Sequence, residues 1–505
     1  MLASMATFAI EGVHSREVTV EVDVRQGLPV FTLVGLPDAA VREARERVRA
    51  AMLNSGLEFP LKRLTANLAP ADLRKAGPGF DLALAIAVLS ASGQIPSEGL
   101  DNCAAVGELS LSGTLRPVRG AVAMAAGARR AGYERLIVPD ENAAEAALVD
   151  GLEVLPVPDL GRLVDLVCGR WRPERPERIR HVRTTRDGGP DLADVRGQDD
   201  AKRALEIAAA GGHNVLMVGP PGSGKTMLAR RLPGIMPPPS FDEALEITRI
   251  HSVAGLADGR LVDERPFRAP HHTISPSGLV GGGSTPRAGE ITLAHRGVLF
   301  LDELAEFSRT TLEALRQPLE AGRVEVTRGQ HSIGFPAAVI LVGACNACPC
   351  ARPRPDCDCD DASRARYQRR LSGPLLDRID LVCQLEPARP LELLSASDGR
   401  ERSQTVRDRV VAARERQRHR LAGSGAVCNA DMDVPQTRRH VRLDARLRAR
   451  MLDGHNATSM SARGHDRVLR LARTIADLDG RERVGSADVD EALSYRMSAA
   501  WRLAA

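Results

Sequence analysis

The sequence has few aromatic residues and no long apolar run. Phenylalanine, tyrosine and tryptophan together make up 3% of its 505 residues, so few rings are present to stack on unpaired bases. If a nucleic acid is the partner, we expect contact with its phosphate backbone and no reading of base sequence. No apolar stretch reaches the roughly 20 residues that a membrane-spanning helix needs. Residues 1–5 do not form a basic segment followed by an apolar one, and we therefore expect a cytoplasmic protein.

The net charge is also small for a chain of this length. The formal charge is +4, so contact with a polyanion would have to come from local basic patches rather than from a global field. The strongest local excess of arginine lies in the segment 400–450. A chain of this length exceeds one hydrophobic core, and we expect roughly two to four domains.

Nine cysteines are too few for a disulfide scaffold of this size, and five of them lie between residues 345 and 359. Two Cys-x-Cys pairs are separated by a turn that contains two prolines. Four thiolates converging from such a loop suit a tetrahedral Zn²⁺ ion, whereas a loop of free thiols or one able to form disulfides is the alternative. Cys345 follows an apolar run, and we expect it to pack in the core. The candidate zinc ligands are Cys348, Cys350, Cys357 and Cys359.

A glycine-rich segment lies between the apolar run 214–218 and a stretch that we expect to be helical, 227–232. A loop between a strand and a helix lets backbone N–H groups surround phosphate oxygens. Lys225 would contact the β and γ phosphates, and the Thr226 hydroxyl would bind Mg²⁺. The segment predicts a site for a nucleoside triphosphate. It reads Gly219-Pro220-Pro221-Gly222-Ser223-Gly224-Lys225-Thr226.

A second apolar run, 297–301, ends in the carboxylates Asp302 and Glu303. This order is typical of a buried parallel strand whose carboxyl end opens into a site. We expect Asp302 to hold Mg²⁺, and Glu303 to orient and deprotonate the attacking water. The alternative is that the two acids only begin a helix.

Changes in composition along the chain predict four parts. Residues 1–170 alternate strands with helices in an α+β or α/β unit. Residues 171–193 are charged and rich in proline, as in a linker. Residues 194–390 contain the nucleotide motifs, and residues 391–505 are mostly helical. The expected strands are 8–10, 17–24, 30–34, 63–68 and 136–138, and the expected helices are 38–55, 81–91, 463–479 and 486–497.

Four further motifs resemble the magnesium-chelatase-like AAA+ ATPases of the ComM/YifB family. They are Asp-Val-Arg-Gly-Gln at 194–198, Phe-Arg-Ala-Pro-His-His-Thr at 267–273, Leu-Phe-Leu-Asp-Glu at 299–303 and Ser-Gly-Pro-Leu-Leu-Asp-Arg-Ile-Asp at 372–380. The resemblance implies an AAA+ P-loop α/β core with a C-terminal helical lid. It also implies ATP and Mg²⁺ as cofactors and a hexameric ring. The implied activity is that of a DNA helicase that drives branch migration in homologous recombination during natural transformation.

The resemblance also assigns catalytic roles to three residues. Asn346 corresponds to the sensor that positions the attacking water. Arg378 corresponds to the arginine finger that reaches the γ-phosphate of a neighbouring subunit. Alternatively, it is a surface arginine paired with Asp377 or Asp380. Arg463 corresponds to the second sensor arginine, with Arg467 as its rival.

The segment between Lys225 and Asp302 is long for a connection between two core strands, which favours a functional insertion. It contains His271 and His272, which are equally well explained as packing residues, and we assign no metal to them. Downstream, residues 324–333 alternate as in a β-hairpin that points into the pore of the ring. Arg328 and His331 near its tip are candidates for contact with a phosphate backbone, unless the tip is simply solvated.

The N-terminal segment resembles the Lon-protease-like (ribosomal S5 domain 2-like) domain fused to this family. Gly79 stands at the position of the serine nucleophile and Val122 at that of the activating lysine, so the proteolytic dyad is absent. We expect a scaffold or a DNA-binding collar. The candidate basic contacts are Lys62, Arg63, Arg74 and Lys75.

Taken together, these motifs predict an AAA+ ATPase that hydrolyses ATP with Mg²⁺ to move on or remodel branched or single-stranded DNA. Two alternatives belong to other classes. A metal-chelatase motor subunit would be stimulated by its partner subunits and not by DNA. A regulatory nucleotide-binding module would be unaffected by Glu303→Gln, a change that should trap ATP in a working motor.

Overall fold

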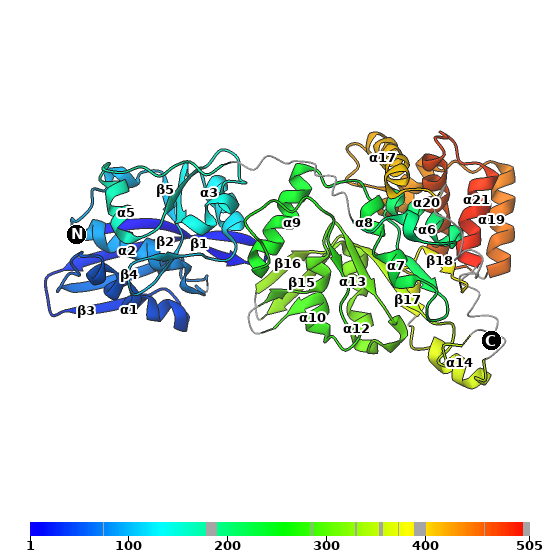
Figure 1. The fold of residues 1–505 in the computed structure, drawn as a ribbon, viewed down its shortest axis with the longest axis horizontal. Coiled ribbons are helices and arrows are strands. Elements are labelled where there is room, and N and C mark those ends of the chain that lie inside the picture. The colour runs from blue at the N-terminus through cyan, green and yellow to red at the C-terminus, as the bar shows by residue number, and fades with distance from the viewer. Residues whose placement is uncertain are drawn as a thin grey trace. The chain divides into compact units, whose positions relative to one another are not determined.

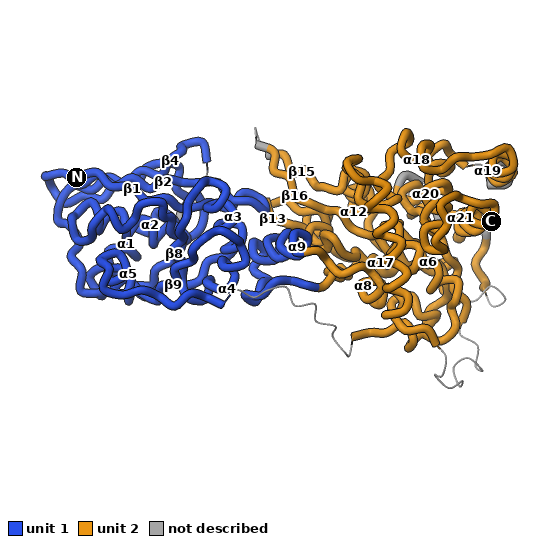
Figure 2. The backbone as a smooth tube through the Cα atoms, turned by 90° about the horizontal axis from the view of Figure 1, so that it is seen from above, with its two compact units in different colours: residues 1–182, 241–263 blue, residues 183–240, 264–505 orange. Residues whose placement is uncertain are grey.

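The computed structural model describes residues 1–73, 75–177, 189–283, 286–328, 331–352, 357–371, 373–387, 400–458 and 460–497. The chain divides into two compact units, which Figure 2 shows in different colours. Unit 1 comprises residues 1–182 and 241–263, and unit 2 comprises residues 183–240 and 264–505. Each is described by itself below.

Unit 1 is built on a mixed sheet with the strand order β3-β4-β2-β1-β5-β8-β9. The hairpin β1-β2 and the pair β2-β4 are antiparallel, whereas β3-β4, β1-β5, β5-β8 and β8-β9 are parallel. A short antiparallel pair, β6-β7, lies outside the main sheet. The strands are β1 (Leu2–Glu11), β2 (His14–Arg25), β3 (Val30–Val34), β4 (Arg63–Ala69), β5 (Cys103–Ala105), β6 (Glu108–Leu109), β7 (Leu115–Arg116), β8 (Arg135–Pro139) and β9 (Glu153–Val157).

Both faces of this sheet are covered, so successive strand residues enter different cores. Met5 belongs to the core formed with α1, α2 and α5, whereas its neighbour Ala6 belongs to the core formed with α3 and α4. Every residue of α2 is buried. The helical segments are α1 (Ala39–Asn54), η1 (Pro78–Phe80), α2 (Asp81–Ala91), η2 (Glu98–Leu100), α3 (Ala121–Ala131), η3 (Asp140–Asn142), α4 (Ala143–Ala146) and α5 (Leu160–Val167).

Helix α9 (Phe241–Ala254) belongs to unit 1, although it follows the glycine-rich loop in sequence. It contacts α3, and Ala244 and Leu261 join the core on that face of the sheet. The Gly120 backbone N–H also donates to the Ser252 carbonyl at 3.2 Å. The domain boundaries predicted from the sequence, at residues 170, 193 and 390, remain predictions. They do not assign residues 241–263 to the N-terminal unit.

Unit 2 is built on a parallel sheet with the strand order β11-β14-β17-β10-β18 among its described residues. Its central strands β10, β14 and β17 are buried along their whole length, as parallel strands covered on both faces should be. The strands are β10 (Val215–Val218), β11 (Phe267–Arg268), β14 (Val298–Leu301), β17 (Ile340–Cys345) and β18 (Leu381–Gln384).

Shorter elements of unit 2 connect the strands of this sheet. The antiparallel hairpin of β15 and β16 closes with Arg328 opposite His331, as the alternation predicted, and a second small pair joins β12 and β13. These elements are η4 (Leu192–Asp194), α6 (Asp199–Gly211), α7 (Lys225–Ala229), α8 (Leu232–Ile235), α10 (Pro276–Val280), β12 (Gly281–Gly282), β13 (Arg287–Ala288), α11 (Glu290–Leu293), η5 (Leu304–Glu306), α12 (Arg309–Ala314), α13 (Arg316–Ala321), β15 (Arg323–Arg328), β16 (His331–Pro336), α14 (Asp361–Gln368) and α15 (Gly373–Leu376).

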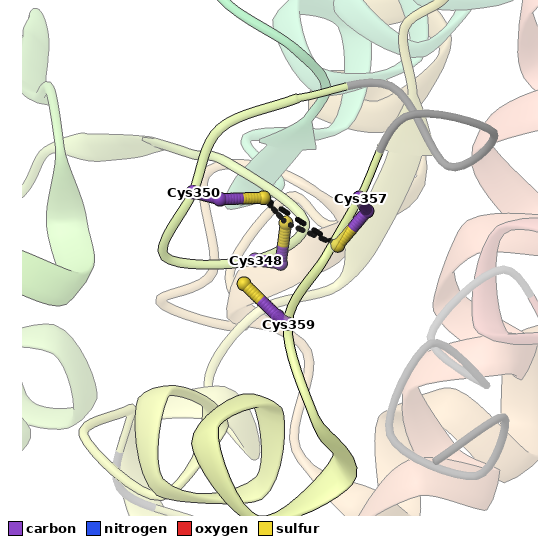
Figure 3. Close-up of side chains that lie close together, drawn as sticks. All are labelled: Cys348, Cys350, Cys357 and Cys359. Atoms are coloured by element: carbon purple, nitrogen blue, oxygen red, sulfur yellow. Dashed lines mark hydrogen bonds between the residues drawn. The ribbon is translucent and has the colours of Figure 1, made fainter.

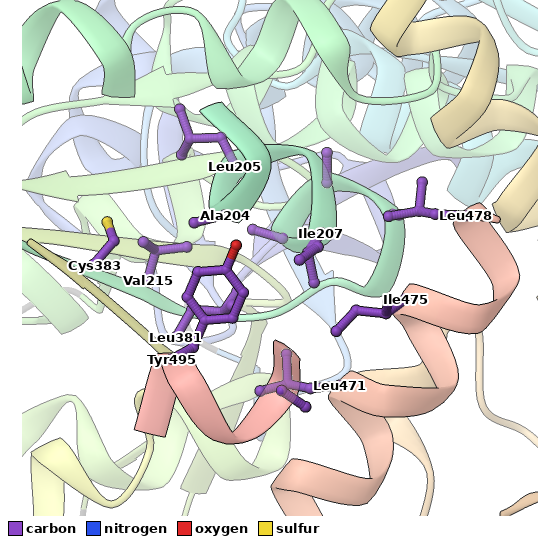
Figure 4. Close-up of a cluster of buried hydrophobic side chains, with 14 of the residues drawn as sticks. Ala204, Leu205, Ile207, Val215, Leu381, Cys383, Leu471, Ile475, Leu478 and Tyr495 are labelled. Carbon is purple, nitrogen blue, oxygen red and sulfur yellow. The ribbon is translucent and has the colours of Figure 1, made fainter. Parts of the chain in front are cut away.

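The C-terminal helices of unit 2 pack against the sheet through α6 (Figure 1). Leu471 and Ile475 of α20 share one buried cluster with Ile207 of α6 and with Val215 of β10 (Figure 4). Tyr495 of α21 closes the same cluster. The helical segments are α17 (Ser403–Arg420), η7 (Asn429–Asp431), α18 (Val434–His440), α19 (Ala445–Thr458), α20 (Ala462–Leu478) and α21 (Ser486–Met497).

The strands and helices named from the sequence are confirmed, with one difference. The helix expected at 227–232 is two short helices, α7 and α8, because α8 begins at Leu232 with a proline in its first turn. Among the described residues, no helix combines the length and the apolar character that crossing a membrane requires.

Candidate functional site

The glycine-rich loop joins the carboxyl end of β10 to the N-terminus of α7, as its sequence predicted. Gly222 and Gly224 have φ values of +76° and +90°, which residues with a Cβ atom rarely adopt. A Cβ on Gly219 would lie 2.7 Å from the Leu385 carbonyl oxygen. The backbone conformation therefore requires glycine at these positions.

Lys225 contacts both the glycine-rich loop and Asn346, the residue that follows β17. Its Nζ donates to the carbonyl oxygens of Gly219 and Pro220 at 2.7 and 2.9 Å, and to Asn346 Oδ1 at 3.3 Å. Burial lowers the pKa of Lys225, although Asp302 and Glu303 oppose that shift. The cation is thus partly desolvated and poised over a loop of backbone N–H groups, which suits binding of an anionic phosphate.

Thr226 and Asp302 bring a hydroxyl and a carboxylate together beside this loop. Thr226 Oγ1 donates to Asp302 Oδ2 at 2.7 Å, and these are oxygen donors of the kind that Mg²⁺ prefers. Ser223 Oγ is buried and has no hydrogen-bond partner within the part of the chain that the structure describes. A buried polar atom without a partner is costly. The residues present therefore fit a phosphate with its magnesium ion.

Glu303 has a backbone conformation that is unusual for a glutamate. Its φ is +50°, in the left-handed region, where a residue with a Cβ costs on the order of 1 kcal/mol or more and is often found at a functional site. His272 Nδ1 lies 3.4 Å from Glu303 Oε2. The sequence offered packing as one explanation of His272, and the contact with Glu303 was not foreseen. Its sequence signals are a position within a long insertion and within the motif 267–273, and neither marks Glu303 as its partner.

Asn346 directly follows β17 and reaches the loop through Lys225. Strand β17 lies between β14 and β10 in the sheet. Because all three strands are parallel, their carboxyl ends meet at one edge. This topology brings Lys225, Thr226, Asp302, Glu303 and Asn346 together through direct contacts or adjacent positions, as predicted. Their chemical roles remain predictions.

Two predicted arginines belong to a different cluster. Arg378 is buried; its Nε donates to the Arg316 carbonyl at 2.9 Å, and its guanidinium forms an ion pair with Glu320. Arg463, which is exposed, lies 3.6 Å from the same Glu320 carboxylate. Sequence reasoning proposed Asp377 or Asp380 as alternative partners of Arg378 and missed Glu320, which no local motif marks.

Arg467, the rival of Arg463, contacts the start of β18. Its Nε lies 3.4 Å from Asp380 Oδ1, and its Nη1 donates to the Ile379 carbonyl at 3.4 Å. Arg496 donates to the same carbonyl at 2.6 Å. Arg467 therefore links the C-terminal helices to the sheet. Arg463 instead lies beside Glu320, the residue that pairs with Arg378.

The four predicted cysteines form one cluster in the structure (Figure 3). One sulfur from each of Cys348, Cys350, Cys357 and Cys359 lies within 4.8 Å of the others. Burial raises the pKa of Cys348 to about 12, whereas the Cys359 backbone N–H and the neighbouring thiols lower the pKa of Cys357 to about 6. Cys345 is buried, as predicted, and burial raises its pKa to about 12.

The basic residues proposed for the N-terminal unit have different environments. Lys62 and Arg63 are exposed. The prediction for Lys75 as a surface contact is wrong: its side chain is fully buried and its Nζ donates to the Pro70 carbonyl. A backbone bridge to Pro37 draws Lys75 inward. Arg74 lies outside the described residues.

For the remaining predicted residues, the structure gives the element in which each lies and, for some, the burial of the side chain. Val122 is fully buried in α3, and Gly79 lies in η1. Arg328 and His331 form the last pair of the β15-β16 hairpin, and nothing further is described for their side chains.

Comparison with family models assigns the chain region by region. Residues 191–393 match the model for magnesium chelatase, subunit ChlI. Residues 20–142 match that for subunit ChlI of Mg-chelatase, and residues 400–496 match that for the ChlI C-terminal region.

Relatives of nearly the full length are found in several bacteria. An uncharacterized protein of Mycobacterium tuberculosis is 47% identical over 98% of each chain. The uncharacterized protein YifB of Escherichia coli is 44% identical, and the competence protein ComM of Haemophilus influenzae is 41% identical, each over 98% of this chain and 97% of the relative. The chain belongs to the ComM/YifB family of magnesium-chelatase-like AAA+ proteins. Membership in this ComM/YifB family indicates ATPase activity.

A separate and partial similarity concerns Lon proteases. Lon protease 2 of Bacillus subtilis is 28% identical over 31% of this chain and 32% of its own. This supports the expected Lon-like resemblance in part. The mixed sheet of unit 1 and the parallel sheet of unit 2 agree with the α/β fold class.

Proposed function

We propose that this ComM/YifB family member hydrolyses ATP with Mg²⁺ and uses the energy to move on or remodel DNA. The observation that supports this most strongly is the meeting of Lys225, Thr226, Asp302 and Asn346 at one edge of a parallel sheet. Lys225 neutralises phosphate charge, and Thr226 and Asp302 hold Mg²⁺. Glu303 activates the attacking water, and Asn346 positions it. Phosphoryl transfer depends mainly on such positioning and charge neutralisation.

Arg378 and Arg463 act, in this proposal, on the nucleotide of a neighbouring subunit in a hexameric ring. Both pair with Glu320, whereas Lys225, Thr226, Asp302 and Asn346 meet at the glycine-rich loop. An arginine supplied by a neighbour adds positive charge where the transition state gains negative charge. Hydrolysis would then depend on assembly of the ring.

The DNA-related part of the proposal draws on the relative named competence protein ComM and on the β15-β16 hairpin. The hairpin places Arg328 and His331 beside its turn, where they would contact the phosphate backbone without reading sequence. Branch migration in recombination or transformation is the proposed role. Unit 1 serves as a non-proteolytic scaffold or collar, with Lys62 and Arg63 as exposed basic contacts.

The four-cysteine cluster is proposed to bind Zn²⁺. Four sulfur ligands are the commonest donors for structural zinc, and a tetrahedral site with Zn–S bonds near 2.3 Å requires sulfurs roughly 3.8 Å apart. In the structure, the sulfurs of Cys348, Cys350 and Cys357 are 3.1 to 3.5 Å apart, somewhat closer than that spacing.

The ATPase proposal is tested by steady-state ATP turnover of the purified chain. Lys225→Ala should abolish turnover, whereas Lys202→Ala on α6 is a matched control that removes a lysine outside the site. Glu303→Gln should bind ATP normally and release almost no phosphate. Unchanged turnover in Lys225→Ala, or no turnover in the wild-type chain, would overturn the proposal.

The DNA proposal is tested by the same assay without DNA and with single-stranded DNA, duplex and a four-way junction. Turnover should rise with DNA, most with the branched substrate. Arg328→Ala should reduce that stimulation, whereas Arg323→Ala at the base of the hairpin should retain it. Equal turnover with every DNA would instead favour a chelatase-type motor or a regulatory module.

A further inference from the structure

The four-cysteine loop begins where the candidate catalytic strand ends. Asn346 follows β17, and Cys348 and Cys350 are the second and fourth residues after it. Cys357 and Cys359 lie against the first pair (Figure 3). Only one residue therefore separates Asn346 from the first of the four cysteines.

Helix α14, which follows the second pair, returns to the same residue. Tyr367 of α14 is buried, which raises the pKa of its hydroxyl, and the neighbouring Asn346 backbone opposes that shift. Arg364, one turn earlier, donates to Cys357 Sγ at 3.7 Å. Asn346 is thus fixed on one side by the loop and on the other by the helix that the loop leads into.

The same helix also reaches the segment that carries Glu303. Arg370, just after α14, donates to Glu306 Oε2 at 2.9 Å. The Glu306 backbone N–H in turn donates to the Glu303 carbonyl at 2.7 Å. The loop and α14 therefore support both residues that would handle the attacking water.

The sequence of the loop offers little apolar surface. Between Cys348 and Asp360 the residues are mostly proline, aspartate, arginine and cysteine, with alanine as the only other apolar type. A segment of this composition cannot bury enough apolar surface to fix its own conformation. A metal ion bound by four thiolates supplies that stabilisation directly, because binding energy becomes folding energy.

We propose that a zinc ion held by Cys348, Cys350, Cys357 and Cys359 fixes the position of Asn346 through the loop and Tyr367, so that metal occupancy controls ATP hydrolysis but not ATP binding. The inference rests on the proposed ATPase function. Lys225 is also held by the Gly219 and Pro220 carbonyls, so its position over the glycine-rich loop does not depend on Asn346 alone. Loss of the metal therefore lowers kcat and leaves the Kd for ATP nearly unchanged.

The test compares the full chain with two variants, under reducing conditions. Cys357→Ser removes one ligand, and Cys168→Ser, a cysteine of unit 1 outside the cluster, is the matched control. The wild type and the control should contain about one zinc ion per chain by elemental analysis. Cys357→Ser should lose it. Its kcat should fall about tenfold or more, while its Kd for a fluorescent ATP analogue should change by less than about twofold, the range of an unaltered site.

A third variant distinguishes an effect on the position of Asn346 from an effect on the folding of the loop. Tyr367→Phe keeps the buried ring and removes only the hydroxyl beside the Asn346 backbone, so it should retain zinc and still lower kcat. Hydrogen exchange of the peptides 340–348 and 361–371 provides a readout that does not depend on activity. Exchange there should accelerate in Cys357→Ser and stay as in the wild type in Cys168→Ser.

Three results would overturn the inference: a wild-type chain without bound metal, a Cys357→Ser variant with wild-type kcat, or exchange that is unchanged when zinc is lost. A wild-type chain that binds zinc but does not hydrolyse ATP would refute the proposed function. In that case accelerated exchange around Asn346 on zinc loss would still support the structural coupling, and unchanged exchange would refute it.

Discussion

The ion pairs around Asp380 should give unit 2 a stability that depends on pH. Asp380 is almost fully buried at the start of β18, and it accepts from the Asn214 backbone N–H at 3.0 Å. Burial raises its pKa, but a hydrogen bond from His213 and the positive charge of Arg467 outweigh burial and lower the pKa to about 2. Asn214 precedes β10 and Asp380 precedes β18, so this carboxylate connects the amino-terminal ends of the two strands.

The size of the effect follows from this pKa shift. The carboxyl has a pKa of 3.8 in an unperturbed chain, and a shift to about 2 corresponds to about 2.4 kcal/mol at pH 7. Because the folded pKa is the lower one, this stability is fully present above pH 3.8 and is lost as the pH falls through about 2. At pH 3 about 1.3 kcal/mol should remain.

The assay is urea unfolding of the full chain, followed by far-UV circular dichroism at pH 7 and pH 3. Asp380→Asn keeps the shape and loses the charge, so it should reduce the free energy of unfolding by about 2 kcal/mol at pH 7 and by about half as much at pH 3. Asp453→Asn, an exposed aspartate on α19, should change little at either pH. An equal loss at both pH values for Asp380→Asn, or no loss at pH 7, would refute the reasoning.

Three further predictions concern single side chains. Glu320→Gln removes the carboxylate that pairs with Arg378 and Arg463, and turnover of the assembled protein should rise about two- to fivefold; a fall in turnover at unchanged Tm would contradict this. Asp477→Ala leaves its buried partner Arg473 unpaired and should cost about 3 to 5 kcal/mol in urea unfolding, whereas a loss under 1 kcal/mol would show that the charge is compensated elsewhere. His272→Ala frees Glu303 and should lower kcat about tenfold without changing ATP affinity; wild-type kcat would assign His272 to packing alone.

The elements of the fold could be predicted from the sequence where the pattern was local. The apolar runs that became β10 and β14, and the helical spacing that became α20, depend on residues a few positions apart. The glycine-rich loop could be predicted because an apolar run precedes it and a helical stretch follows it. The one error of this kind is the helix at 227–232: α7 ends at Ala229, and a new helix, α8, begins at Leu232 with Pro233 in its first turn.

Contacts between distant residues could not be predicted in this way. Lys75 looked like a surface cation, yet the chain bridge to Pro37 buried it. Helix α9 follows the glycine-rich loop in sequence and belongs to the other unit. His272 has no signal in the sequence that separates packing from contact with Glu303.

The sequence by itself determined the chemistry of the candidate site, since the residue types and their local spacing already specify a phosphate loop, two carboxylates and four thiols. The tertiary structure decided which of these residues meet. Strand order placed Asn346 against Lys225, and packing of the C-terminal helices placed Arg463 beside Glu320 and Arg378. Those pairings depend on which strands and helices become neighbours, and neighbours far apart along the chain are selected by burial of the whole core rather than by any local pattern.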